Sequence, residues 1–347
     1  IMYFYRRMTE MELDKKVKAF IKLGDWFREQ TGEQFENLCS MATNQNNWFT
    51  NDSIEKSFSA WAGSLQAEKL NEWVKPHQFK NQGRKIGLVL AGNIPLVGLH
   101  DVLSVLISGN IACIKYSSQD SILMKAVLNA LVTIEPEFKD QIQEVERLND
   151  VDAVIATGSD NSARYFKHYF GNKPHIIRQN RVSIGIVNGQ ESTEDFEDLG
   201  EDIFTYFSLG CRNVSKVFVP KDFSLPTLIG SMDKFSSALD HHKYRNNYDY
   251  NKSIYLVNKE PHLDSGFFMM KESQELVSPI SVVFYEYYSS EAELSLKLSA
   301  LQEKIQCMVS KDGWYEGSLP FGTAQCPELW DYADGVDTLG FLSETIR

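Results

Sequence analysis

The sequence predicts an α/β protein made of doubly wound parallel sheets. Short, continuous apolar runs such as 86–91 have the length and composition of strands that are buried on both faces. Segments with apolar residues at helical spacing separate these runs. Strands that alternate with helices in this way form parallel sheets, and 347 residues are enough for two domains of this kind.

The chain begins with a region that predicts helices as far as about residue 80. Two helical faces carry apolar residues at helical spacing: Leu13, Val17, Phe20, Ile21, Leu23 and Phe27, and then Ile54, Phe58, Trp61, Leu65, Leu70 and Trp73. We expect this helical N-terminal region, 1–80, to cover a sheet or to contact a partner subunit. We also expect the protein to be a homo-oligomer.

From Lys85 the pattern changes to alternating strands and helices, which predicts a first α/β domain over 81–205. The predicted strands are 86–91, 111–115, 151–156, 174–177 and 182–187, and the predicted helices are 96–107, 119–134 and 160–170. A further helical pattern runs from Phe196 to Phe207 and stops at Gly210.

The second half repeats the alternation, which predicts a second α/β domain over 206–322 and a C-terminal return segment over 323–347. The predicted strands are 214–219, 253–257, 280–285 and 305–309, and the predicted helices are 225–239 and 291–301. The polar, aromatic tract 241–251 predicts a surface helix and loop. The glycine-rich stretch 313–322 is typical of loops that line a site.

Composition narrows the class of protein. A net charge of -12 argues against a general nucleic-acid binder, which needs a basic face to displace counterions. No stretch approaches the roughly 18 uninterrupted apolar residues of a membrane-spanning helix, so we expect no integral membrane segment. The five cysteines are scattered, without a CxxC pair or a Cys/His cluster. We therefore expect no metal site and a cytoplasmic protein.

Cys211 lies where a predicted helix gives way to a predicted strand. Loops held between rigid elements are where reactive side chains are usually presented. A thiol at such a place is either a nucleophile or a small apolar filler, and the filler is the more common of the two. Position alone therefore leaves both readings open.

Other candidate residues follow the predicted strands of the first domain. Asn93 comes after the first strand, where an amide can donate to a developing oxyanion or simply form a turn. Lys115 ends the second strand and can reach a nucleotide or stay solvated. Thr157-Gly158-Ser159 precedes a helix, where free N–H groups favour a phosphate or serve as an ordinary cap.

One candidate carboxylate, Glu275, precedes a predicted strand of the second domain. It can orient a ribose or a water, although most glutamates in such places are only solvated. The dinucleotide fingerprint GxGxxG does not occur in the sequence, so spacing alone does not prove a nicotinamide site.

In combination and in order, six pieces resemble the aldehyde dehydrogenase superfamily: Gly92-Asn93-Ile94-Pro95, Lys115-Tyr116-Ser117, Thr157-Gly158-Ser159, Gly210-Cys211, Glu275-Leu276-Val277-Ser278-Pro279 and Pro320-Phe321-Gly322. Within this superfamily the chain more closely resembles the LuxC-type acyl-CoA reductases. The tracts that carry this second resemblance are Leu90-Ala91-Gly92-Asn93-Ile94-Pro95, Ala156-Thr157-Gly158-Ser159-Asp160, Arg178-Gln179-Asn180-Arg181-Val182-Ser183 and Gly210-Cys211-Arg212-Asn213-Val214-Ser215. The resemblance implies an aldehyde dehydrogenase-like fold, with a dinucleotide-binding domain over 81–205 and a catalytic domain over 206–322.

The resemblance also implies roles for these residues. Cys211 would attack an acyl-CoA, or another activated acyl donor, with Asn93 and the Cys211 N–H holding the oxyanion. NADPH, with NADH as the alternative, would reduce the acyl-enzyme to an aldehyde. The implied cofactor contacts are Lys115 and Ser117 at the adenosine end, Gly158 and Ser159 at the pyrophosphate, Glu275 at the nicotinamide ribose, and Phe321.

The departures from the superfamily pattern are informative. Hydrolytic aldehyde dehydrogenases carry a glutamate before the catalytic helix that activates water, but the matching tract 178–181 contains no carboxylate. Water attack on an enzyme-bound thioester should then be slow. Lys115 is followed by Tyr116 instead of proline, and Gly92 replaces a bulky residue, which leaves the cofactor preference open.

Three alternatives remain at this point. The first is a CoA-acylating aldehyde dehydrogenase that runs in the oxidative direction. The second is a thiol acyltransferase that uses Cys211 without a redox cofactor. The third is a degenerate member of the superfamily kept as an interaction subunit, against which the presence of both Cys211 and Asn93 counts.

Overall fold

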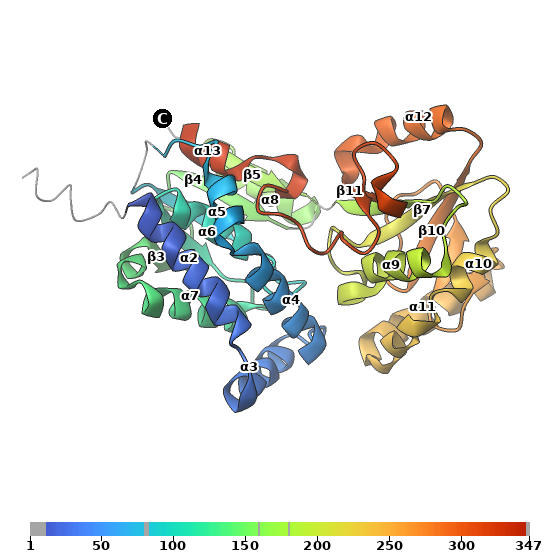
Figure 1. Cartoon of the computed structure of the whole chain (residues 1–347), viewed down its shortest axis with the longest axis horizontal. Coiled ribbons are helices and arrows are strands. Elements are labelled where there is room, and N and C mark those ends of the chain that lie inside the picture. Colours follow the sequence, from blue (N-terminus) through green and yellow to red (C-terminus); the bar gives the residue numbers. More distant parts are fainter. Residues whose placement is uncertain (1–11, 80–82, 159, 180, 345–347) are drawn as a thin grey trace, which may run out of the picture. The chain divides into compact units, whose positions relative to one another are not determined.

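A computed structural model describes residues 12–79, 83–158, 160–179 and 181–344. These residues form two compact units (Figure 1). The first contains the described residues up to Gln179 together with those from Glu328 onward, and the second contains the described residues between them. Each unit is built around one sheet.

The first unit begins with a layer of helices, as the sequence predicts. They are α2 (Leu13–Arg28), α3 (Gly32–Gln45), α4 (Asn51–Ser64) and α5 (Ala67–Val74). Thr50 caps α4, because its hydroxyl accepts from the Ser53 N–H while the Ser53 hydroxyl accepts from the Thr50 N–H. Helix α2 packs against α4 and against α7 (Ser121–Ile134).

Five parallel strands form the sheet of the first unit, in the order β3-β2-β1-β4-β5. Their bounds are β1 Lys85–Val89, β2 Ile111–Lys115, β3 Ile142–Glu144, β4 Ala153–Thr157 and β5 His175–Arg178. Val89 at the end of β1 pairs with Lys115 on one side and with Ala156 on the other. The segments that follow β1, β2 and β4 therefore leave the sheet at the same edge.

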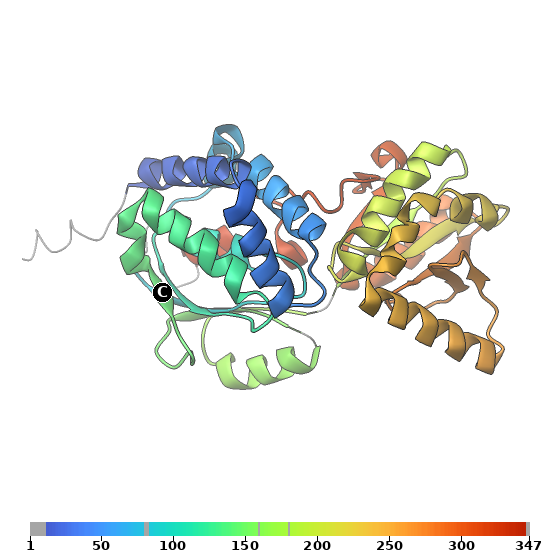
Figure 2. The same ribbon diagram turned by 90° about the horizontal axis from the view of Figure 1, so that it is seen from below.

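Helices cover both faces of this sheet. Figure 2 shows α8 (Asp160–Phe170) on the face opposite to α7. Helix α6 (Leu99–Ile107) contacts β1, β2 and the C-terminal helix α13 (Thr338–Glu344), and a short 3-10 helix spans Pro136–Gln141. Leu339 and Leu342 of α13 are buried in the core of this unit. The last described part of the chain thus belongs to the first unit.

The second unit has a seven-stranded sheet in the order β12-β11-β6-β7-β10-β9-β8. Only the pair β8 and β9 is antiparallel among the strands that the structure describes. The bounds are β6 Val182–Ile186, β7 Val214–Pro220, β8 Leu263–Asp264, β9 Met269–Glu272, β10 Val282–Tyr288, β11 Ile305–Ser310 and β12 Leu319–Pro320.

Helices also lie on both faces of the second sheet (Figure 1). Helix α12 (Glu291–Leu301) covers one face, and α9 (Thr193–Phe204), α10 (Leu225–Gly230) and α11 (His242–Asn258) lie on the other. Leu294 and Leu298 of α12 pack with Ile184, Ile186 and Phe218 of the sheet in one apolar cluster.

Several features of the second half differ from the sequence-based predictions. The short strands β8, β9 and β12 were not predicted. The strand predicted at 253–257 is wrong, because this segment is the last part of α11. Its β-branched residues favour a strand locally, but Tyr244, Tyr248, Asn251 and Tyr255 are buried at helical spacing. The helix predicted over 225–239 divides into α10 and a 3-10 helix, Asp233–Asp240.

The units also divide at a different place from the predicted domains. The expected boundary at 205 lies inside the second unit, because β6 pairs with both β7 and β11 and α9 packs on β7. Strand β6 pairs with segments that are far from it in the chain. The local periodicity of the sequence cannot predict such pairing.

Candidate active site

Cys211 lies beyond an unusual turn at the end of α9. The helix ends at Phe204, earlier than the sequence predicts, and Tyr206, Phe207 and Ser208 follow with φ of 55°, 56° and 61°. All three are left-handed residues with side chains. This conformation costs about 1–2 kcal/mol per residue, so other contacts must hold the turn in place.

Asn213 supplies the main contacts that hold this turn. Its Nδ2 donates to the carbonyls of Asp202 (3.1 Å), Ile203 (3.2 Å) and Thr205 (2.7 Å), and its Oδ1 accepts from the Gly210 N–H at 2.8 Å. The amide therefore ties the end of α9 to the segment that carries Cys211. The sequence places Asn213 in the tract 210–215 that resembles the LuxC family, but it predicts no role for this side chain.

The structure separates the cysteines by exposure. Cys39 and Cys113 are buried, and burial raises the pKa of both thiols, that of Cys39 to about 11. Cys307 is half-buried, whereas Cys211 and Cys326 are exposed. A nucleophilic thiol must reach its substrate and ionise, which favours an exposed cysteine over a buried one.

Ser183 of β6 holds the backbone beside Cys211. Its hydroxyl donates to the Cys211 carbonyl at 3.1 Å and lies 3.0 Å from the Cys307 sulfur. Ser183 is fully buried, so the exposed Cys211 is held from the interior side of the sheet.

The Pro320-Phe321-Gly322 loop is tied to the same region of the second unit. The buried Asp202 carboxylate near the end of α9 accepts from the Gly322 N–H at 2.7 Å and from the Ala324 N–H at 2.9 Å. The Arg212 guanidinium donates to the Ala324 carbonyl at 3.3 Å. Phe321, which is itself buried, is thus placed by contacts from both sides of Cys211.

Glu275 lies in the segment between β9 and β10 and is exposed. The Ser215 hydroxyl of β7 donates to the Leu276 carbonyl at 2.7 Å. This bond holds the segment that contains Glu275 against β7, the strand that follows Cys211.

Asn93 belongs to the first unit, in the loop after β1. Three side chains fix this loop. The Asn46 amide donates to the Gly92 carbonyl and the Ser57 hydroxyl to the Pro95 carbonyl, both at 3.0 Å, and the Asp120 carboxylate accepts from the Leu96 N–H at 2.6 Å. Leu96 is left-handed, with φ of 58°. As at Cys211, a strained turn is held by a buried polar group.

The packing of this loop explains why a glycine, Gly92, precedes Asn93. A Cβ on Gly92 would lie 2.5 Å from the Ser117 hydroxyl and 3.1 Å from the Asp120 Cβ. The absence of a side chain therefore lets the loop after β2 pass close to the Asn93 loop. The loops that carry Asn93 and Ser117 therefore lie against each other at the same sheet edge.

The residues at this edge suit a nucleotide. Lys115 is exposed at the end of β2, and the Ser117 hydroxyl accepts from the Gln119 N–H at 3.2 Å. A Cβ on Gly158, after β4, would lie 2.8 Å from the Ser162 Cβ, so α8 begins close to the strand. An ammonium, a hydroxyl and a glycine near a helix start are groups that bind phosphate and ribose. Ser159 lies outside the described residues.

Comparison with known proteins places the chain in a family. A family model described as Acyl-CoA reductase (LuxC) matches residues 31–246. The chain belongs to this family. One relative is the long-chain acyl-protein thioester reductase of Aliivibrio fischeri, 24% identical over 240 residues, which are 60% of this chain and 49% of the relative. The match thus spans about half the length of that curated relative.

Solved structures confirm the predicted fold class, two doubly wound α/β domains of the aldehyde dehydrogenase type with a helical N-terminal region. An aldehyde dehydrogenase of Mycobacterium tuberculosis complexed with NAD+ has a TM-score of 0.64 at 13% identity, covering 87% of this chain and 74% of the other. The NADP-dependent glyceraldehyde-3-phosphate dehydrogenase of Bacillus halodurans C-125, complexed with NADP, has a TM-score of 0.63 at 12% identity, covering 88% and 75%.

In this LuxC-family chain, the tract 178–181 begins with a structural arginine. The Arg178 guanidinium, 5% exposed, pairs with the Asp101 carboxylate of α6 and donates to the Thr338 hydroxyl of α13 at 3.0 Å. Arg178 therefore ties β5 to two helices of the first unit. A glutamate base has no counterpart among the residues of this tract.

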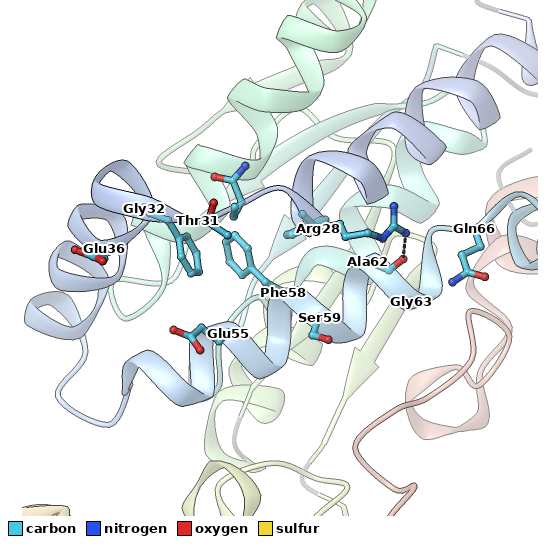
Figure 3. Close-up of a pocket in the computed structure, with 13 residues that line it drawn as sticks. Arg28, Thr31, Gly32, Glu36, Glu55, Phe58, Ser59, Ala62, Gly63 and Gln66 are labelled. Atoms are coloured by element: carbon cyan, nitrogen blue, oxygen red, sulfur yellow. Dashed lines mark hydrogen bonds between the residues drawn. The ribbon is translucent and has the colours of Figure 1, made fainter.

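A groove of about 620 Å³ lies among α2, α3 and α4 (Figure 3). Phe27, Phe35 and Phe58 supply its apolar lining, and Glu36 and Glu55 stand at its rim. None of the predicted site residues that the structure describes lines this groove, so it is separate from the candidate active site.

Within the described ranges, no group of three or more His, Cys, Asp or Glu side chains is arranged to hold a metal ion. Over the same part of the chain, no helix has both the length and the apolar character needed to cross a bilayer.

Asp120→Asn is expected to weaken the pH dependence of stability. Burial raises the folded-state pKa of Asp120 from 3.8 to about 8. The folded protein therefore keeps a proton that the unfolded chain releases between these values, and stability falls as pH rises through that window. Between about pH 5 and about pH 9, we expect the variant to lose less unfolding free energy than the wild type, by on the order of 1–4 kcal/mol.

Urea unfolding at the two pH values measures this difference. Burial also raises the pKa of Asp202, to about 7, so a residual slope of the same sign should remain in Asp120→Asn. A slope equal to that of the wild type would contradict the burial of an ionisable group at position 120.

Proposed function

We propose that this protein reduces an acyl thioester, with acyl-CoA as the donor, to the aldehyde through an acyl group held on Cys211. The observation that carries the proposal is the exposed Cys211 thiol on a turn fastened by Asn213, in a chain of the LuxC family. A buried cysteine filler would need no such support.

In the first step the Cys211 thiolate attacks the acyl carbonyl carbon, a new S–C bond forms, and the electron pair moves to the carbonyl oxygen. The Asn93 amide and the Cys211 N–H are the proposed donors to that oxygen. The bond to the leaving sulfur then breaks, and the CoA thiolate departs and takes up a proton. The product is an acyl-Cys211 thioester.

NADPH is the proposed reductant, with NADH as the alternative. Lys115 and Ser117 would hold its adenosine end, Gly158 and Ser159 its pyrophosphate, and Glu275 its nicotinamide ribose. Phe321 is a further proposed cofactor contact. The bound cofactor would supply a hydride to the acyl carbon. The tetrahedral adduct then collapses: the C–S bond breaks, its electron pair stays on the Cys211 sulfur as a thiolate, and the aldehyde is released.

The absence of a carboxylate from 178–181 supports reduction over hydrolysis. Water needs a base to attack a thioester at a useful rate, and the buried Arg178 is committed to an ion pair with Asp101. The acyl group therefore stays on Cys211 until it is reduced or returned to a thiol. The relative in Aliivibrio fischeri is named for an acyl-protein donor, so acyl-protein and acyl-CoA donors both belong in the test.

Cys211→Ala is expected to abolish acyl-CoA-dependent NADPH oxidation, by about 1,000-fold or more, because the covalent step has no substitute nucleophile. Absorbance at the NADPH band measures the rate over acyl-CoAs of graded chain length. Cys326→Ala, which removes another exposed thiol of the second unit, is the matched control and should keep the wild-type rate. Retained reduction in a folded Cys211→Ala would overturn the proposal.

Asn93→Ala is expected to lower kcat and kcat/KM together by about 100- to 1,000-fold while KM stays near the wild-type value. A donor that acts on the oxyanion stabilises the transition state and not the bound substrate. Steady-state kinetics separates the two parameters. Asn129→Ala, at an exposed position of α7, is the control. A rise in KM at constant kcat would instead make Asn93 a substrate-binding residue.

A further inference from the structure

Asn213 holds Gly210, the residue before Cys211, at both ends of its backbone. The Gly210 N–H donates to the Asn213 Oδ1 at 2.8 Å, and the Gly210 carbonyl accepts from the Asn213 N–H at 3.1 Å. A trans peptide is planar, so the Cys211 N–H points opposite to the Gly210 carbonyl. The Cys211 N–H is therefore directed away from Asn213.

The peptide plane on the other side of Cys211 is fixed as well. Its carbonyl accepts from the Ser183 hydroxyl at 3.1 Å. The Asn213 carbonyl in turn accepts from the Ser183 N–H at 3.2 Å, where β6 begins to pair with β7. Both planes that flank the nucleophile are thus tied to the sheet through Ser183 and Asn213.

The chemistry of these contacts requires an amide at position 213. Three carbonyls, at 202, 203 and 205, face Nδ2, and one N–H faces Oδ1. Asparagine presents donors on one side and an acceptor on the other. An aspartate of the same shape would bring a negative charge against three carbonyl oxygens, and the side chain is 2% exposed, so water could not screen it.

We propose that Asn213 is a positioning residue for acyl transfer: it holds the Cys211 thiol and directs the Cys211 N–H at the oxygen of the attacked carbonyl. This role rests on the proposed function, because it acts through Cys211. It goes beyond the support of a turn, since it predicts an effect on the rate of acylation in a protein that is fully folded.

The test compares Asn213→Asp and Asn213→Ala with the wild type, at a temperature well below the melting temperature of each. Intact-protein mass spectrometry follows the acylation of Cys211 by butanoyl-, decanoyl- and tetradecanoyl-CoA without a reductant. We expect the rate constant of acylation to fall about 100-fold or more in both variants, the usual effect of a lost oxyanion donor or a misplaced nucleophile. The alanine variant adds no charge, so the acylation rate can still be measured on it if the aspartate variant does not fold.

A second reaction separates positioning from thiol reactivity. Alkylation by iodoacetamide needs the thiolate but no oxyanion donor, so its rate constant in Asn213→Ala should stay within about 5-fold of the wild type. Asn246→Asp makes the same amide-to-carboxylate change at an exposed position of α11 and should acylate like the wild type.

The possible outcomes distinguish the positioning role of Asn213 from the proposed function of the protein. Acylation of the folded Asn213 variants within about 3-fold of the wild type would overturn the positioning role and leave the proposed function standing. No acyl adduct on the wild type with any of the three donors would overturn the proposed function, and this role with it.

Discussion

The hydrogen bonds of the Asn213 amide are the constraint on which the candidate active site depends. They close a loop from the end of α9 to the start of β7 and hold three successive left-handed residues, Tyr206 to Ser208, that would not keep this conformation unaided. The result is an exposed thiol on a rigid base. Helix α9, strand β7 and, through Asp202, the Phe321 loop all meet at this loop.

In the first unit, buried polar side chains hold the loop that carries Asn93 in the same way. There the left-handed Leu96 is held by the buried Asp120 carboxylate, and the neighbouring carbonyls are held by Asn46 and Ser57. In both units a loop that bears a candidate catalytic group is strained locally and fixed by a buried polar side chain. Such sites fix geometry before the substrate arrives, which is what oxyanion stabilisation requires. Two of these side chains, Asp120 and Asp202, are carboxyl groups that the fold must bury. Desolvation raises the pKa of both.

The sequence predicted the elements that depend on local patterns and missed those that depend on distant partners. Apolar periodicity was enough for the helical layer and for most strands, and the ordered motifs led to Cys211 and Asn93. The role of the Asn213 side chain could not be predicted, because it depends on hydrogen bonds to carbonyls eight to eleven residues upstream. The strand predicted at 253–257 failed because tertiary burial favours a helix there. Strand β6 was assigned to the wrong unit because its partners, β7 and β11, lie far along the chain.

The most direct test of the account is the lifetime of an acyl group on Cys211. Wild-type protein is acylated with an acyl-CoA, freed of excess donor, and followed by intact-protein mass spectrometry with and without NADPH. The account predicts an adduct that maps to Cys211, persists without the reductant, and is discharged as the aldehyde when NADPH is added. Rapid loss of the adduct as the free acid, with no aldehyde in either case, would contradict it.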